Sequence, residues 1–189
     1  MSEPISKPMS EPIPASPRTP LHRRNIDVQG YLREDGLWEI EGVLEDTKGY
    51  DIELFDRGRI EVGGFLHRMR LTLIINDQLQ ILDARATMYH TPYQDCPGAA
   101  QQYQALVGLQ IGKGWLADAR KAVGRLSGCT HLTEMLPVLA TAAMQTIRGY
   151  HLSHTAGYSN GSEERKAVLN TCYGFRPGGR AQIHLWPEE

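Results

Sequence analysis

Apolar and polar positions alternate along the first half of the chain with the period of two that is typical of β-strands. The apolar positions of the first two runs are Ile26, Val28, Trp38, Ile40, Gly42 and Leu44. Between these runs, "REDGL" carries an Asp-Gly pair that favours a hairpin turn. After a segment expected to be a polar loop, "DTKGYDIELFDRGRIEVGG", the runs "LHRMRLTLIIND" and "QLQILDARATMY" predict two more strands. The first half therefore predicts an antiparallel sheet.

After Cys96 the apolar residues recur at helical intervals instead. The segments "PGAAQQYQALVGL" and "GWLADARKAVGRL" each predict a helix, with Pro97 suited to a first helical position. "THLTEMLPVLATAAMQTIRGY" is the longest apolar helical run, and Pro137 is expected to kink or restart it. Near the C-terminus, "RAQIHLW" is expected to add one strand or a small hairpin.

The order of these segments predicts the fold class. Strands that precede helices favour an α+β domain, an antiparallel sheet with helices packed on one face. Residues 1–21 carry a proline every few positions, which predicts a disordered arm rich in Pro and Ser, with a partner-binding segment as the alternative. Residues 22–189 are expected to form a single domain.

Composition narrows the class of protein. The chain has 189 residues and a net charge of -2, which gives no electrostatic reason to expect a nucleic-acid partner. Its three cysteines are an odd number, unlike the paired set of a small secreted domain. No signal peptide and no apolar stretch of about 20 residues is present, so no membrane association is expected. These features predict a cytoplasmic protein and leave its oligomeric state open.

Four residues that can bind metals stand at predicted element boundaries, which converge in space more readily than element interiors. They are His67, Cys96, Cys129 and His131. Two thiolates and two imidazoles suit a single zinc ion, or iron when one position stays open. The alternative is that the cysteines are small buried residues and that the histidines bond the backbone, because the spacing is not that of a zinc finger.

Two further residues are candidates for roles beside such a site. Tyr93 is close to Cys96 in sequence and is a candidate catalytic acid or base. Asp46, at a predicted strand end, could orient a ligand histidine or bind an anion, with a solvated strand end as the alternative.

The residues from "HRMRLTLIIND" to "GCTHLTEMLPVLATAAMQTI" resemble the iron-sulfur scaffold family of IscU and NifU. The resemblance implies an IscU/NifU-like core in which His67 replaces a ligand aspartate, and Cys96 and Cys129 match two ligand cysteines. The family's first cysteine would fall at Phe65 and its histidine at Gly128, so both ligands are missing. His131 is the candidate replacement for that histidine.

Over residues 22–189 the chain more closely resembles a bacterial family of unknown function, DUF2889. The segments that carry this resemblance are "DGLWEIEGVLEDTK", "LHRM", "PYQDCP", "IGKGW" and "GCTHL". Their combination is more specific than any single motif, but it implies no activity.

Two classes of function remain open at this point. The first is a mononuclear zinc or iron enzyme that acts on a small organic substrate as a lyase or hydrolase, with Trp38 and Tyr93 lining the pocket. The second is a carrier or scaffold for sulfur or an iron-sulfur cluster, with Cys129 as sulfur acceptor, although Phe65 cannot ligate a cluster iron. A structural metal without catalysis would fit the same ligands.

Overall fold

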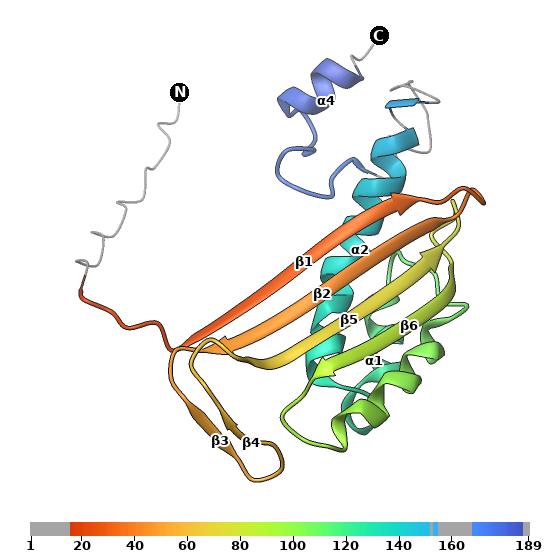
Figure 1. The fold of residues 1–189 in the computed structure, drawn as a ribbon. Helices are drawn as coiled ribbons and strands as arrows, with labels where there is room; N and C mark the ends of the chain where they lie inside the picture. Colours follow the sequence, from red (N-terminus) through yellow and green to blue (C-terminus); the bar gives the residue numbers. More distant parts are fainter. Residues whose placement is uncertain (1–15, 152, 155–167, 187–189) are drawn as a thin grey trace.

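A four-stranded antiparallel sheet forms the framework of the domain (Figure 1). The computed structural model describes residues 16–151, 153–154 and 168–186. The strand order is β1-β2-β5-β6, and the strands are β1 (His22–Leu32), β2 (Trp38–Lys48), β5 (Phe65–Ile75) and β6 (Ile81–His90). This sheet confirms the antiparallel arrangement predicted from the alternating runs.

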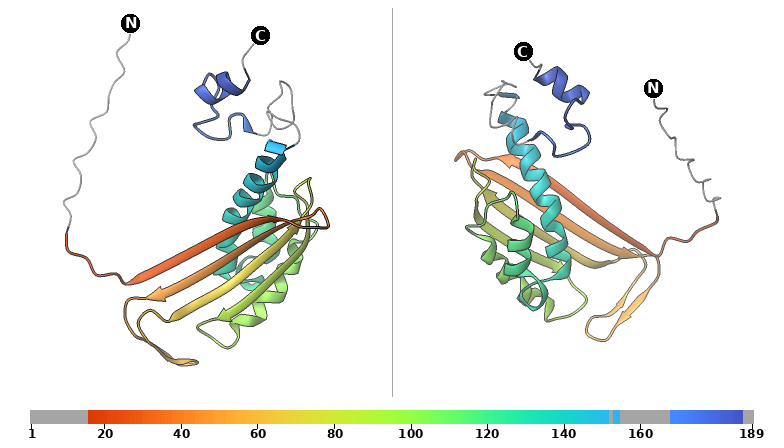
Figure 2. Two further views of the ribbon diagram at one scale, coloured as in Figure 1. Left: turned by 45° about the horizontal axis from the view of Figure 1, so that its top comes forward. Right: turned by 180° about the vertical axis from the view of Figure 1, so that it is seen from behind.

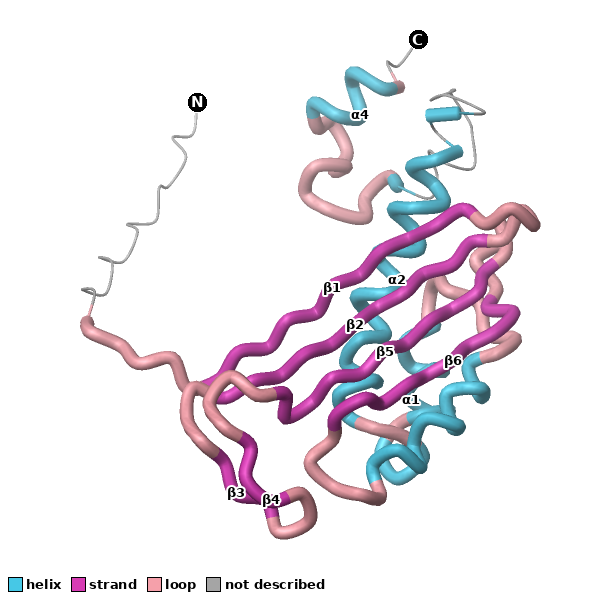
Figure 3. Tube along the Cα trace, in the orientation of Figure 1, coloured by secondary structure: helices cyan, strands magenta, loops and turns pink. Residues whose placement is uncertain are grey.

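A second, two-stranded hairpin projects from one end of the sheet, where the sequence predicts only a loop (Figure 3). It consists of β3 (Ile52–Leu54) and β4 (Gly58–Ile60). Gly58 has a φ of 70°, which a residue without a side chain adopts at little cost in the turn. Asp51 stabilises the base of the hairpin, since it pairs with Arg59 and accepts a 2.8 Å hydrogen bond from the Val62 N–H. Strands of three residues are too short for alternation to identify them.

The helices that follow cover one face of the sheet (Figure 2). They are the 3-10 helix η1 (Cys96–Leu106), α1 (Trp115–Val123), the short η2 (Arg125–Ser127) and α2 (Thr130–His151). The α+β class with helices on one sheet face is therefore confirmed. No helix within the described ranges is long and apolar enough to cross a membrane.

The core lies between the sheet and α2. Trp38, Ile40 and Leu44 of β2 point towards the helices and are at most 2% exposed. Two glycines let α2 approach the strands closely: a Cβ at Gly30 would lie 2.1 Å from the Thr146 hydroxyl oxygen, and one at Gly42 would lie 2.8 Å from the terminal methyl of Met135. α2 therefore packs directly against the backbones of β1 and β2.

One local prediction is wrong in part and another is wrong. Pro137 does not restart α2, which runs as one helix from Thr130 to His151 because the apolar residues on both sides of Pro137 are buried together, while a kink at Pro137 stays a prediction. The segment expected as a strand near the C-terminus is the helix α4 (Arg180–Leu185). Hydrogen bonds within this segment satisfy its backbone, as in the 2.8 Å bond from the Trp186 N–H to the Gln182 carbonyl, whereas a strand there would need a free sheet edge.

The N-terminal arm expected over residues 1–21 lies mostly outside the described residues. Residues 16–21 carry no regular secondary structure, and the Leu21 carbonyl accepts a 3.1 Å hydrogen bond from the Gly49 N–H. Regular secondary structure begins with β1 at His22, while the division between arm and domain and the disorder of the arm stay predictions.

Candidate metal centre

A row of polar side chains crosses the inner face of the sheet at one end. Arg24 on β1 is the register partner of Asp46 on β2, and Asp46 is in turn the partner of His67 on β5. Asp46 and His67 continue the alternation that buries Leu44 and Met69, so their side chains point towards the helices. Positions that the pattern would fill with apolar residues thus hold a cation, a carboxylate and an imidazole side by side.

The Asp46 carboxylate is the centre of this row and is only 1% exposed. Its Oδ1 and Oδ2 accept hydrogen bonds of 2.8 Å from Nε and Nη2 of Arg24, and Oδ2 lies 3.0 Å from Nδ1 of His67. Burial raises the pKa of Asp46, but the hydrogen bonds and positive charge of Arg24 outweigh it and hold the pKa below its usual value. Asp46 is therefore an ionised, oriented carboxylate at neutral pH.

α2 brings a second imidazole to the carboxylate. His131 lies in the first turn of α2, with Nε2 3.7 Å from Oδ2 of Asp46 and with its ring centroid 3.7 Å from that of His67. One ligand atom from each of Asp46, His67 and His131 lies within 4.8 Å of the other two. We call these three residues the acid-histidine cluster.

Both imidazoles of the cluster are neutral at neutral pH. Burial, followed by the charge of His131, lowers the pKa of His67 to about 4. Burial and the charge of Arg24 also lower the pKa of His131. A neutral imidazole keeps a lone pair on one ring nitrogen, which is the form that binds a metal ion.

The donors of the cluster fit a single transition-metal ion. Two imidazoles with one carboxylate form the donor set of mononuclear iron sites with open positions, and zinc accepts the same donor types. Arg24 occupies one lone pair on each carboxylate oxygen, and the remaining side of Oδ2 faces Nδ1 of His67 at 3.0 Å. Glu134 lies 2.5 Å from Nη1 of Arg24 and offsets part of its charge, although Arg24 has the larger effect on the pKa of His131.

The structure brings some of the predicted ligands together. His67 and His131 come together, and Sγ of Cys129 lies 3.8 Å from Nδ1 of His131. This is the ring nitrogen opposite the one that faces Asp46, so Cys129 contacts His131 on the side away from the carboxylate. Neither Cys129 nor Cys96 belongs to the acid-histidine cluster within the described ranges. A ligand set with two sulfurs stays a prediction.

Cys96 lines a hollow together with Tyr93 and with Gly128, the residue before Cys129. It begins η1, and the hollow is also lined by Phe55 of the β3–β4 hairpin, whose ring centroid lies 5.6 Å from that of Tyr93. The proximity of Tyr93 to Cys96 is thus seen, while a catalytic role for Tyr93 stays a prediction. Trp38 does not line this hollow, because it is buried at the other end of β2, where its indole N–H donates to Asp77 at 2.9 Å.

Tyr103 fixes the turn that carries His131. Its hydroxyl donates to the Cys129 carbonyl at 2.9 Å, accepts from the Cys129 N–H at 3.2 Å and lies 2.9 Å from the Thr133 hydroxyl. The Tyr103 ring is fully buried against the core. These contacts hold the start of α2 in place over the sheet, and with it the position of His131.

Sequence reasoning missed Arg24 and gave Asp46 only a subordinate role. The signal for Asp46 was its place in the alternating run of β2, two positions after Leu44, where an inward apolar residue is expected. Arg24 stands two positions before Ile26 on the first strand, in the same inward phase. In both strands a charged residue stands at a position where the alternation predicts an apolar side chain facing the helices. This pattern is the signal in the sequence that could have predicted the polar row.

The comparisons with known proteins identify a family. The family model described as a protein of unknown function, DUF2889, matches residues 22–145, from the start of β1 into the second half of α2. The matched region contains Arg24, the whole acid-histidine cluster and Cys129. Comparison with curated proteins and with solved structures gives no match, so no solved neighbour supports the likeness to the iron-sulfur scaffolds. The family match covers well over half of the sequence, and the chain therefore belongs to the DUF2889 family of proteins of unknown function.

Proposed function

We propose that this domain binds one zinc or iron ion through Asp46, His67 and His131 and acts as a metal-dependent enzyme on a small organic substrate. The observation that carries the proposal is the convergence of three donor atoms within 4.8 Å on an otherwise apolar sheet face. Buried polar groups are costly unless they are paired or bind a ligand, so such a cluster has a function or a specific structural role.

The surroundings of the cluster support ligand binding as well as structure. Arg24 holds the carboxylate in one orientation, and Tyr103 holds the turn that bears His131. Fixed donors reduce the ordering that a metal ion must impose when it binds. A bound zinc or iron ion would supply Lewis-acid chemistry, either polarising a substrate oxygen or activating water.

The side of the cluster nearest the solvent suggests where a substrate would enter. The side chains of Asp46 and His67 are 1% and 9% exposed, whereas those of His131 and His22 are 26% and 39% exposed. Nε2 of His22 lies 3.5 Å from Oδ1 of Asp46, so His22 borders the same carboxylate. A small substrate would reach the centre between His22 and His131, where it meets two imidazole donors.

The carrier or scaffold alternative rests on Cys129. This cysteine is half-buried and contacts His131, so it could accept sulfur beside the cluster. The assembled donors are nitrogen and oxygen, however, and Phe65 packs against the His90 ring with centroids 5.5 Å apart. This donor set favours a single metal ion over an iron-sulfur cluster.

Elemental analysis and an electronic spectrum of the purified protein test the proposal together. We expect one zinc or iron per chain, with a strong loss in His67→Ala and partial retention with weaker zinc preference in His67→Asp. Cys96→Ser serves as the control and should keep full metal content. Metal-free wild-type protein that resists reconstitution, or unchanged occupancy in both His67 variants, would show that the cluster is a structural polar network.

A further inference from the structure

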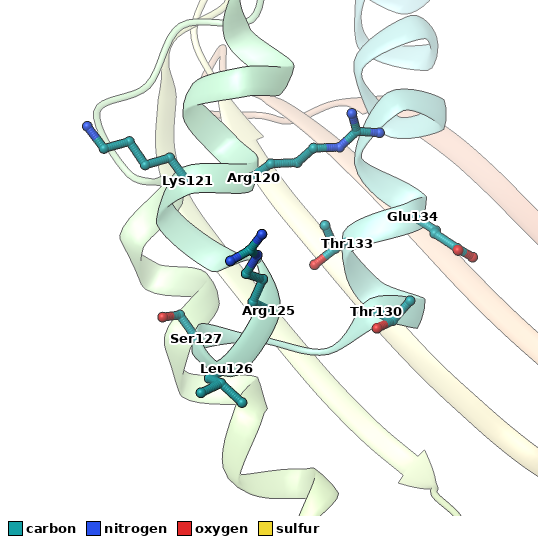
Figure 4. Close-up of a pocket in the computed structure, with 9 residues that line it drawn as sticks. Arg120, Lys121, Arg125, Leu126, Ser127, Thr130, Thr133 and Glu134 are labelled. Atoms are coloured by element: carbon teal, nitrogen blue, oxygen red, sulfur yellow. The ribbon is translucent and has the colours of Figure 1, made fainter.

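A hollow of about 750 Å³ lies between α1, η2 and the first turns of α2 (Figure 4). Its lining includes Arg120 at the end of α1, Arg125 and Leu126 in η2, and Thr130 at the start of α2. This volume lies within the range of about 300–1,000 Å³ that is usual for small-molecule pockets. The hollow is separate from the acid-histidine cluster, none of whose members lines it.

Two guanidinium groups give the hollow its charge. Figure 4 shows Arg120 and Arg125 extending into the space between α1 and α2, and Lys121 also belongs to the lining of the hollow. Within the described ranges, neither arginine side chain has a hydrogen bond or an ion pair. The acidic side chain on the wall, Glu134, is instead engaged by Arg24 at 2.5 Å. The two positive charges are therefore not neutralised by the protein.

The backbone at Arg125 provides an independent observation. Arg125 has a φ of 55°, in the left-handed region that residues other than glycine rarely adopt. Such a conformation is unfavourable and persists where the surroundings require it, often at ligand sites. Here it accompanies the sharp change of direction after Gly124, between α1 and η2, from which the Arg125 side chain reaches the hollow.

We propose that this hollow binds the phosphate group of a small phosphate monoester. The planar fork of a guanidinium group matches two phosphate oxygens, and two such forks match a dianion. The Thr130 hydroxyl on the opposite wall can donate a further hydrogen bond, and the exposed Leu126 offers an apolar contact for the organic part. This inference goes beyond the proposed metal centre and does not depend on it.

Calorimetric titration of the full chain with phenyl phosphate and with inorganic phosphate tests this site. Arg120→Gln and Arg125→Gln should each weaken phenyl phosphate binding about tenfold, as expected for the loss of a charge-assisted hydrogen bond. Lys113→Gln removes the same charge from an exposed position that does not line the hollow and should change the affinity by less than about twofold. All three side chains are exposed, so circular dichroism should show an unchanged fold.

The two probes distinguish the source of the phosphate. Tighter binding of phenyl phosphate assigns the site to an ester, while equal affinities assign it to free phosphate, and both results support the anion site. No binding of either probe at millimolar concentration would overturn the proposal. Equal weakening in the Lys113→Gln and arginine variants would also overturn it, because the phosphate would then respond to the overall charge of the protein and not to this hollow.

Discussion

The imidazole rings of His67 and His131 lie with their centroids 3.7 Å apart and their planes inclined by 32°. One ring belongs to a central strand and the other to the long helix that covers it, and Asp46 faces both. Two protonated rings at this separation would repel each other strongly, so the arrangement favours the neutral forms. This contact links the stability of the domain to the protonation of the centre.

The first prediction concerns acid. The folded state lowers the pKa of His67 to about 4, whereas an unfolded chain has a histidine pKa of about 6.5. Between these values the unfolded chain binds more protons, so the free energy of unfolding should fall as pH decreases through this window, by at most about 3 kcal/mol from His67. Urea unfolding of metal-free protein across this window measures the slope.

His67→Gln provides the comparison for this slope. It removes the titrating group, and the dependence of stability on pH should become clearly shallower than in the wild type. His90→Gln, which replaces an exposed histidine of β6, is the matched control for the substitution itself. An equal slope in the wild type and His67→Gln would show that His67 does not titrate differently on folding.

The second prediction concerns Arg24. Its positive charge contributes to the low pKa of both His67 and His131, so Arg24→Gln should raise both values, as measured by NMR titration. The same change leaves the buried Asp46 without its strongest partner and should lower the free energy of unfolding by about 2 kcal/mol or more.

Arg33 offers a matched control for Arg24. It pairs with Asp35 and Glu39 on the exposed hairpin turn, and exposed pairs add little stability. Arg33→Gln should therefore change stability much less than Arg24→Gln and should leave the histidine titrations unchanged. Similar effects of the two substitutions would argue against a special role of the polar row.

The third prediction concerns the packing of α2 on the sheet. A methyl group at Gly30 would lie 2.1 Å from Oγ1 and 2.8 Å from Cβ of Thr146, so rotation of the threonine alone cannot relieve the clash. Gly30→Ala should lower the free energy of unfolding by about 1–3 kcal/mol, measured by thermal or chemical unfolding. Gly149→Ala, within α2 and with no atom nearby, should instead raise it by up to about 1 kcal/mol. A neutral Gly30→Ala variant would mean that α2 lies further from β1.

Much of the fold could be predicted because its signals are local. Alternation identified β1, β2, β5 and β6, and helical spacing identified η1, α1 and α2. The β3–β4 hairpin was missed because three residues give no measurable period. The helix α4 was predicted as a strand because six residues with few apolar positions fit either period.

The candidate centre could be predicted only in part, because it depends on strand register. His67 and His131 were identified by residue type and by their place at element boundaries. Their meeting with Asp46 requires the pairing of Asp46 with His67, next to the register shift that follows Asp46 in β2. A shift by one residue would move Asp46 to the outer face, and a sequence pattern does not fix long-range pairing to that accuracy.

X-ray absorption at the metal edge of the reconstituted protein tests the central claim most directly. The proposed centre predicts one ion per chain with nitrogen and oxygen neighbours at about 2.0–2.2 Å, including imidazole scattering that is reduced in His131→Ala. A sulfur neighbour at about 2.3 Å would contradict this centre, because it would place Cys96 or Cys129 on the ion instead of Asp46. Protein that binds neither zinc nor iron would contradict the claim altogether.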